Sequence, residues 1–128
     1  MRYLLDTCTF LWVSQQPTLL SEAAGEVINE GSNELFVSDV SIWEITLKHS
    51  NGRLPLPGLP RVWIPRKFEV HQLNPLRLVS DAIYRSGELP RVHTDPFDRL
   101  LAAQAMENGM TILSPDTPLS LLGASRIW

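Results

Sequence analysis

The stretch that decides the fold is residues 93–116, which read HTDPFDRLLAAQAMENGMTILSPD. Residues 96–108 predict a helix, because Asp95 suits the N-cap, Pro96 suits the first helical position and an Asn-Gly pair ends the pattern. Residues 110–114 then predict a short buried strand. A helix that leads directly into a buried strand is a repeating unit of α/β folds with parallel sheets.

Helix and strand patterns alternate through the rest of the chain as well. Apolar runs predict strands at 3–5, 35–38, 68–73 and 125–128. Apolar residues at helical spacing predict helices at 8–16, 21–31, 39–50 and 80–87. The proline-rich residues 53–67 predict a loop with a short helix. This alternation predicts an α/β fold whose parallel sheet is covered on both faces. The length predicts one domain over residues 1–128.

Composition places the protein among ordinary globular proteins, with 44% apolar and 20% charged residues. No apolar run is long enough to cross a bilayer. Asp6 interrupts the N-terminal segment too early for a signal peptide, and the one cysteine, Cys8, cannot form an internal disulfide. We therefore expect a cytoplasmic protein without membrane contacts.

The charges are distributed unevenly along the chain. The net charge is −3, but residues 1–47 carry −6 whereas residues 48–99 carry +4. An acidic protein can still present a basic strip to a polyanion. Arginine and lysine make most phosphate contacts, so the candidates for contacting a nucleic-acid backbone are Arg53, Arg61, Arg66, Lys67 and Arg91. The alternative is an ordinary solvated surface.

Four acids occur at positions that a parallel sheet would bring together. Asp6 follows the first strand, Asp116 follows the strand at 110–114, Asp98 lies in the first turn of a helix, and Glu44 lies at the margin of an apolar helix face. Functional crevices of α/β sheets lie beyond the carboxyl ends of the strands. We therefore expect these four carboxylates to share one crevice.

Each acid also has a local explanation. Asp6 and Asp98 suit the first turns of helices, Glu44 can pair with Lys48 at i,i+4, and Asp116 suits a turn. Together, however, four carboxylates in one crevice repel each other and raise each other's pKa, and a divalent cation removes that repulsion. Oxygen ligands suit Mg²⁺ or Mn²⁺ rather than zinc. Such a cation can activate water and neutralise a scissile phosphate, which predicts phosphodiester hydrolysis.

Four segments resemble, in family order, the PIN domain, and in particular the VapC-type toxins of type II toxin–antitoxin pairs. They are Leu4–Thr7, Ser38–Ile45, His93–Ala105 and Ile112–Asp116. The resemblance implies a three-layer α/β/α fold around a five-stranded parallel sheet and a metal-dependent endoribonuclease that uses Mg²⁺ or Mn²⁺. It also implies that the core metal-site acids are Asp6, Glu44 and Asp98, with Asp116 as the fourth.

The resemblance extends to supporting residues and partners. It implies that Thr7 and Ser41 orient the site and that Asp95 supports it, while Arg99 could steady a carboxylate or contact phosphate. The implied partners are an RNA substrate, a small antitoxin protein and a second copy of the chain. Cys8 departs from the pattern, since many relatives have His or Asn there.

Other prominent residues have ordinary expectations. His93 is expected to be a surface loop histidine. The tryptophans are expected in the core or at interfaces rather than as base-stacking platforms; they are Trp12, Trp43, Trp63 and Trp128.

Two other classes of function stay open at this point. A non-catalytic RNA- or partner-binding PIN-like module could keep the pocket without the chemistry, although the presence of all the core acids disfavours it. A phosphatase or phosphoacceptor domain would use Asp6 as nucleophile. A phosphatase of that kind would carry a second aspartate two residues on, where this chain has Cys8.

Overall fold

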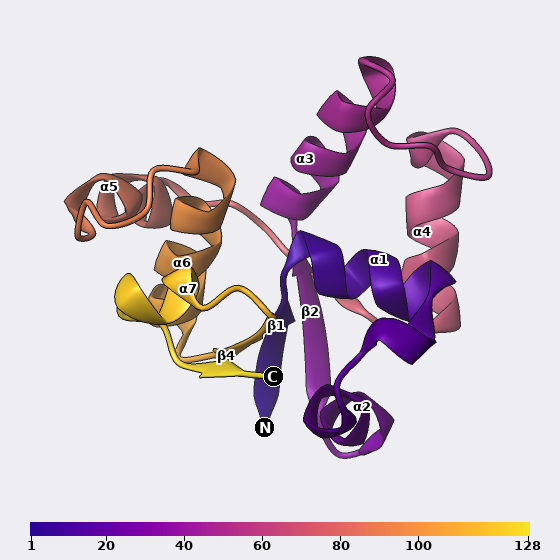
Figure 1. Ribbon diagram of the computed structural model, residues 1–128, viewed down its shortest axis with the longest axis horizontal. Helices are drawn as coiled ribbons and strands as arrows, with labels where there is room; N and C mark the ends of the chain where they lie inside the picture. The colour runs from indigo at the N-terminus through magenta and orange to yellow at the C-terminus, as the bar shows by residue number, and fades with distance from the viewer.

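A parallel sheet of five strands forms the centre of the molecule, in the order β3-β2-β1-β4-β5 (Figure 1). In the computed structural model, which describes residues 1–128, the strands are β1 (Arg2–Leu5), β2 (Glu34–Ser38), β3 (Asn74–Leu76), β4 (Thr111–Leu113) and β5 (Arg126–Ile127). Leu4 of β1 lies opposite Phe36 of β2 and Ile112 of β4. The predicted α/β fold with a five-stranded parallel sheet is confirmed.

Helices cover both faces of this sheet, which gives the predicted three layers. Figure 1 shows α1, α2 and α4 on one side, α5, α6 and α7 on the other, and α3 rising from the end of β2. Their bounds are α1 (Thr7–Gln15), α2 (Glu22–Asn29), α3 (Asp39–Ser50), α4 (Pro60–Val70), α5 (Ser80–Glu88), α6 (Pro96–Asn108) and α7 (Pro118–Leu121), with a 3-10 turn at Pro17–Leu19. None of them has the length and apolar character needed to span a membrane.

Successive residues of the central strands supply two separate cores. In β1, Leu4 packs into the core beneath α6 and α7, whereas Leu5 packs into the core beneath α1 and α4. Ile112 and Leu113 divide in the same way in β4. Side chains alternate between the faces of a strand, and each fully buried leucine or isoleucine contributes about 1.5–3 kcal/mol. Burial on both faces therefore explains why these strands are apolar throughout.

The helix ends follow the local sequence signals closely. Asp95 accepts hydrogen bonds from the amides of Phe97 and Asp98 at the start of α6. Gly109 ends α6 with φ 62°, a left-handed conformation that favours glycine. Ser38 caps α3 by accepting from the Val40 amide. The two helices that carry Glu44 and Asp98 thus have well-defined starting points.

The third strand does not lie where the sequence suggested. The predicted strand at 68–73 is wrong, because residues 60–70 form α4. Pro65 favoured a loop there, yet it lies inside the helix. The apolar face of α4 outweighs that local preference: Trp63 is buried, and the rings of Trp63 and Phe68 both pack edge-on against Phe10. The strand β3 comes a few residues later, at the edge of the sheet, where Pro75 is tolerated.

Candidate active site

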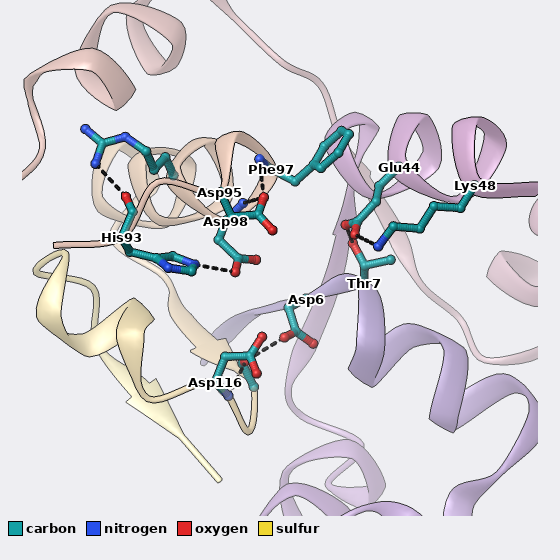
Figure 2. A network of polar contacts seen from close by, with 11 residues as sticks. Asp6, Thr7, Glu44, Lys48, His93, Asp95, Phe97, Asp98 and Asp116 are labelled. Carbon is teal, nitrogen blue, oxygen red and sulfur yellow. Dashed lines mark hydrogen bonds and ion pairs between the residues drawn. The ribbon is translucent and has the colours of Figure 1, made fainter. Parts of the chain in front are cut away.

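The structure brings the four acids together beyond the carboxyl ends of the strands. Asp6 follows β1, Asp116 follows β4, Asp98 lies in the first turn of α6, and Glu44 lies in α3. Figure 2 shows their carboxylates arranged around one space, with Asp6, Asp98 and Asp116 on one side and Glu44 on the other. Parallel strands all point their carboxyl ends to the same edge, which is why residues so distant in the sequence meet here.

Asp6 is the most buried of these acids, with 2% of its surface exposed. Its Oδ1 accepts from the Thr9 amide at 2.8 Å, and its Oδ2 accepts from the Ser114 hydroxyl at 2.5 Å. Burial raises the pKa of Asp6 to about 6, and the charge of Asp116 adds to this effect. The side chain therefore both caps α1 and lacks full compensation for its negative charge.

Glu44 is held by residues from two helices. Its Oε1 lies 2.6 Å from the Thr7 hydroxyl, which lies 2.9 Å from the Ser41 hydroxyl. Because a hydroxyl carries a single proton, Thr7 donates to the carboxylate and Ser41 donates to Thr7. The Lys48 ammonium lies 2.5 Å from Oε2, so the i,i+4 ion pair is present as well. Thr7 and Ser41 occupy the positions at which the family resemblance implied orienting residues.

Asp98 has a partner that the sequence did not reveal. Nε2 of His93 lies 2.8 Å from Asp98 Oδ2, and the His93 side chain is only 24% exposed. His93 lies in a loop, as expected, but it is partly buried against Asp98 rather than on the open surface, because the loop before α6 turns back over the first turn of that helix. Donor atoms of His93, Asp95 and Asp98 all lie within 4.8 Å of one another. Burial raises the pKa of Asp98, and the contact with His93 opposes the shift.

Arg99 anchors the loop that carries His93. Its Nη1 donates to the carbonyls of Pro90 and His93, and its Nη2 donates to the carbonyls of Ser86 and Leu89. Both terminal nitrogens are thus committed to backbone oxygens. Arg99 steadies the site through the loop rather than through a direct contact with a carboxylate.

The Arg99→Lys variant is expected to lower the free energy of unfolding by about 2–3 kcal/mol, because one ammonium cannot serve four carbonyls in a fixed fork. Urea denaturation measures the change. The matched control is Arg85→Lys, since Arg85 makes a single, partly exposed ion pair with Glu107 and should change stability by less than about 1 kcal/mol. Equal effects of the two substitutions would contradict the anchoring role.

The basic residues proposed for RNA contacts lie in two places. Arg53 lies in the loop after α3, and Arg61, Arg66 and Lys67 lie on α4, whereas Arg91 lies in the loop between α5 and α6. Arg53, Arg61, Arg66 and Arg91 are exposed, and the Lys67 ammonium lies over the Trp63 ring. The cation that the structure places directly beside an acid of the site is Lys48.

Cys8 takes no part as a thiolate. Burial raises its pKa to about 12, and the neighbouring charges of Asp6, Asp116 and Glu44 add to the shift. The thiol of the metal-free protein therefore keeps its proton near neutral pH. The donor atoms of the site are carboxylate oxygens with one nearby imidazole.

The chemistry of this donor set fits a hard divalent cation. Oxygen ligands from several elements suit Mg²⁺ or Mn²⁺. A cation would also supply the charge compensation that buried Asp6 lacks.

The fold and the site together define an α/β protein with a cluster of acids at the carboxyl edge of its sheet. A family model described as PIN domain matches residues 3–123, and the chain belongs to this family. It is 29% identical over 117 residues to Ribonuclease VapC22 of Mycobacterium tuberculosis. The aligned residues cover 91% of this chain and 88% of that relative.

Solved structures show the same fold at low sequence identity. One is the VapBC2 complex from Rickettsia felis bound to a promoter DNA fragment, with a TM-score of 0.73, 13% identity and coverage of 99% of this chain and 98% of that one. Another is a toxin–antitoxin complex from Klebsiella pneumoniae, with a TM-score of 0.60, 13% identity and coverage of 90% and 87%. The resemblance to VapC-type PIN domains that the sequence motifs suggested is confirmed.

Proposed function

We propose that this protein is a metal-dependent endoribonuclease that acts as the toxin of a type II toxin–antitoxin pair in the cytoplasm. The observation that carries the proposal is the convergence of Asp6, Glu44, Asp98 and Asp116 around one space, with Asp6 almost completely buried. The likeness to a relative named as a ribonuclease supports the same reaction.

In this proposal Asp6, Glu44 and Asp98 hold Mg²⁺ or Mn²⁺, and Asp116 completes the negative charge around it. When bound, the cation supplies positive charge that stabilises the phosphate in the transition state and makes an attacking water more acidic.

The other residues fix the acids in place. Thr7 and Ser41 hold one oxygen of Glu44 through their hydroxyl chain. His93 holds one oxygen of Asp98, and Asp95 caps the helix on which Asp98 lies. Lys48, at the rim, lies close enough to Glu44 to balance its charge. These contacts limit the rotamers of the acids, which is the preorganisation that catalysis needs.

The test of the proposed function is cleavage of a labelled, structured RNA pool by protein purified free of any partner. We expect cleavage with Mg²⁺ or Mn²⁺ and none in EDTA. RNA binding by the folded protein without cleavage under any of these conditions would instead support the alternative, a non-catalytic binding module. Labelling of Asp6 by beryllofluoride would indicate a phosphoacceptor.

We also propose that the chain forms a homodimer and binds a small antitoxin protein. The likeness to chains in VapBC and toxin–antitoxin complexes supports the second part. An apolar groove of about 630 Å³ between α3 and α4, with Ile42, Leu59 and Ile64 in its lining, offers a surface for an apolar segment of such a partner. Sedimentation of the chain, alone and with the product of a small reading frame next to its gene, tests both parts.

A further inference from the structure

Glu44 differs from the other acids of the site in the charge of its partners. Its Oε1 accepts from the Thr7 hydroxyl at 2.6 Å, and its Oε2 lies 2.5 Å from the Lys48 ammonium. Both oxygens of this carboxylate are thus bound by groups of the protein, and one of these groups carries a full positive charge. The Glu44 side chain is only 10% exposed, so little of it is left for water.

The other three acids have no lysine or arginine partner. Asp6 accepts hydrogen bonds from an amide and a hydroxyl, which are neutral groups. Asp98 is held by the His93 imidazole. At Asp116 the backbone amide donates a hydrogen bond, whereas the carboxylate makes neither a hydrogen bond nor an ion pair within the chain. The protein therefore supplies a fixed cation to one of the four acids, and this acid is Glu44.

The Lys48 ammonium lies among the charges of the site and not only on the surface of α3. Figure 2 shows the Lys48 side chain running back along α3 to meet the Glu44 carboxylate. Burial raises the pKa of Cys8, the charges of Asp6, Asp116 and Glu44 add to the shift, and the charge of Lys48 opposes it. The same thiol is thus within electrostatic range of the ammonium and of three acids. The lysine side chain is also 44% exposed, which leaves it room to move away.

We propose that Lys48 is a built-in competitor of the divalent cation, because its ammonium has to leave Glu44 Oε2 before that oxygen can bind the cation. This inference rests on the proposed function, in which Glu44 is one of the ligands. An ammonium group and a dication about 6 Å apart repel each other in water strongly enough to change the affinity by about 10-fold. Lys48 therefore sets the affinity of the site for divalent cations below the affinity that its carboxylates would have alone.

Two other roles for Lys48 predict different results. Glutamate and lysine at this spacing often pair on helix surfaces, and a pair of that kind would be indifferent to cations at the site. A clamp that holds Glu44 in place would support cation binding, so its loss would weaken binding. Glu44, however, keeps a second support when Lys48 leaves, because Thr7 holds Oε1 and Ser41 holds Thr7. The contacts therefore favour competition over clamping.

The first test is Mn²⁺ binding to the Lys48→Met variant, followed by electron paramagnetic resonance near neutral pH and without RNA. We expect Mn²⁺ to bind about 10-fold more tightly than to the wild type. Lys48→Arg keeps the charge and should stay close to the wild type. The matched control is Arg85→Met, since Arg85 pairs with Glu107 at the other end of α6 from Asp98, and it should leave binding unchanged. Unchanged or weaker binding to Lys48→Met overturns the proposal.

The second test observes the displacement itself in the wild-type protein. The chain has two lysines, Lys48 and Lys67, so selective ¹³C labelling of lysine gives two sets of side-chain signals in an NMR spectrum. Titration with Mg²⁺ should shift the Lys48 signals. Those of Lys67, whose ammonium lies over the Trp63 ring on α4, should stay in place as an internal reference. A Lys48 signal that does not move while Mg²⁺ saturates the site overturns the proposal.

The outcomes also separate this inference from the proposed function. Equal Mn²⁺ affinity of the wild type and Lys48→Met, in a protein that cleaves RNA, overturns the competition alone. Tighter binding to Lys48→Met in a protein that never cleaves RNA supports the competition and contradicts the nuclease. Absence of Mn²⁺ binding to either protein overturns both the competition and the proposed cation site.

Discussion

The Asp98→Asn variant is expected to lose at least ~100-fold of its metal-dependent RNA cleavage while keeping its fold, because even residues that only support a metal ligand change affinity or activity by about 10–100-fold. The amide is neutral and cannot balance a divalent cation. The fold should persist, since Asp95 and not Asp98 accepts the hydrogen bonds that cap α6. Cleavage rates and Mn²⁺ binding followed by electron paramagnetic resonance should fall together.

Two further variants show whether the loss belongs to the metal site. Asp95→Asn keeps a good helix cap, because asparagine and aspartate are about equally favourable at the N-cap. A change in cleavage or Mn²⁺ binding in this variant would therefore come from the lost charge of Asp95 and not from a lost cap. Asp81→Asn removes an exposed acid from the first turn of α5 and should leave the rate unchanged. A fully active Asp98→Asn protein with normal Mn²⁺ binding would contradict the assignment of the site.

The positions of Asp6 and Asp116 follow from topology, and this part of the site was predictable. Asp6 comes directly after β1 and Asp116 follows shortly after β4, and parallel strands bring their carboxyl ends to one edge. Glu44 was harder, because its position on an apolar helix margin fits both a surface ion pair and a crevice. The structure shows the ion pair with Lys48, and it also shows that Thr7 binds the other oxygen of the same carboxylate.

The contacts of the loop before α6 were beyond sequence patterns. Loops have no periodicity that shows which way a side chain points, so nothing placed His93 against Asp98. Arg99 is similar, because the carbonyls that it binds come from the end of α5 and from the following loop and carry no side-chain signature. The error at residues 68–73 has the same origin: a short apolar run fits helix and strand equally, and packing against Phe10 decided between them.

The burial of Asp6 has a consequence for stability that can be measured without RNA. In the metal-free protein its pKa is raised from 3.8 to about 6 by burial. The folded state therefore holds the proton at pH values where the unfolded chain has lost it. The free energy of unfolding consequently falls as the pH rises from about 4 to about 6, by about 3 kcal/mol from this group, and it stays lower above that range.

The Asp6→Asn variant is therefore expected to be more stable than the wild type in EDTA at about pH 7.5, by up to about 3 kcal/mol, and the difference should close toward pH 4. Asparagine can accept from the Thr9 amide and donate to Ser114 Oγ, so the isosteric change keeps both contacts of the carboxylate. Urea denaturation across this pH range measures the gap. Mg²⁺ or Mn²⁺ should stabilise the wild type and not the variant.

Asp116→Asn is the matched control, because Asp116 belongs to the same cluster but is exposed, and its effect should stay within about 0.5 kcal/mol. If Asp6→Asn proved less stable than the wild type at neutral pH in EDTA, the ionised carboxylate would already be compensated inside the protein, and the reason for expecting a cation there would be lost. A stabilised but inactive variant would instead show that Asp6 is kept charged and buried at the expense of the fold, which is expected of a residue retained to bind a cation.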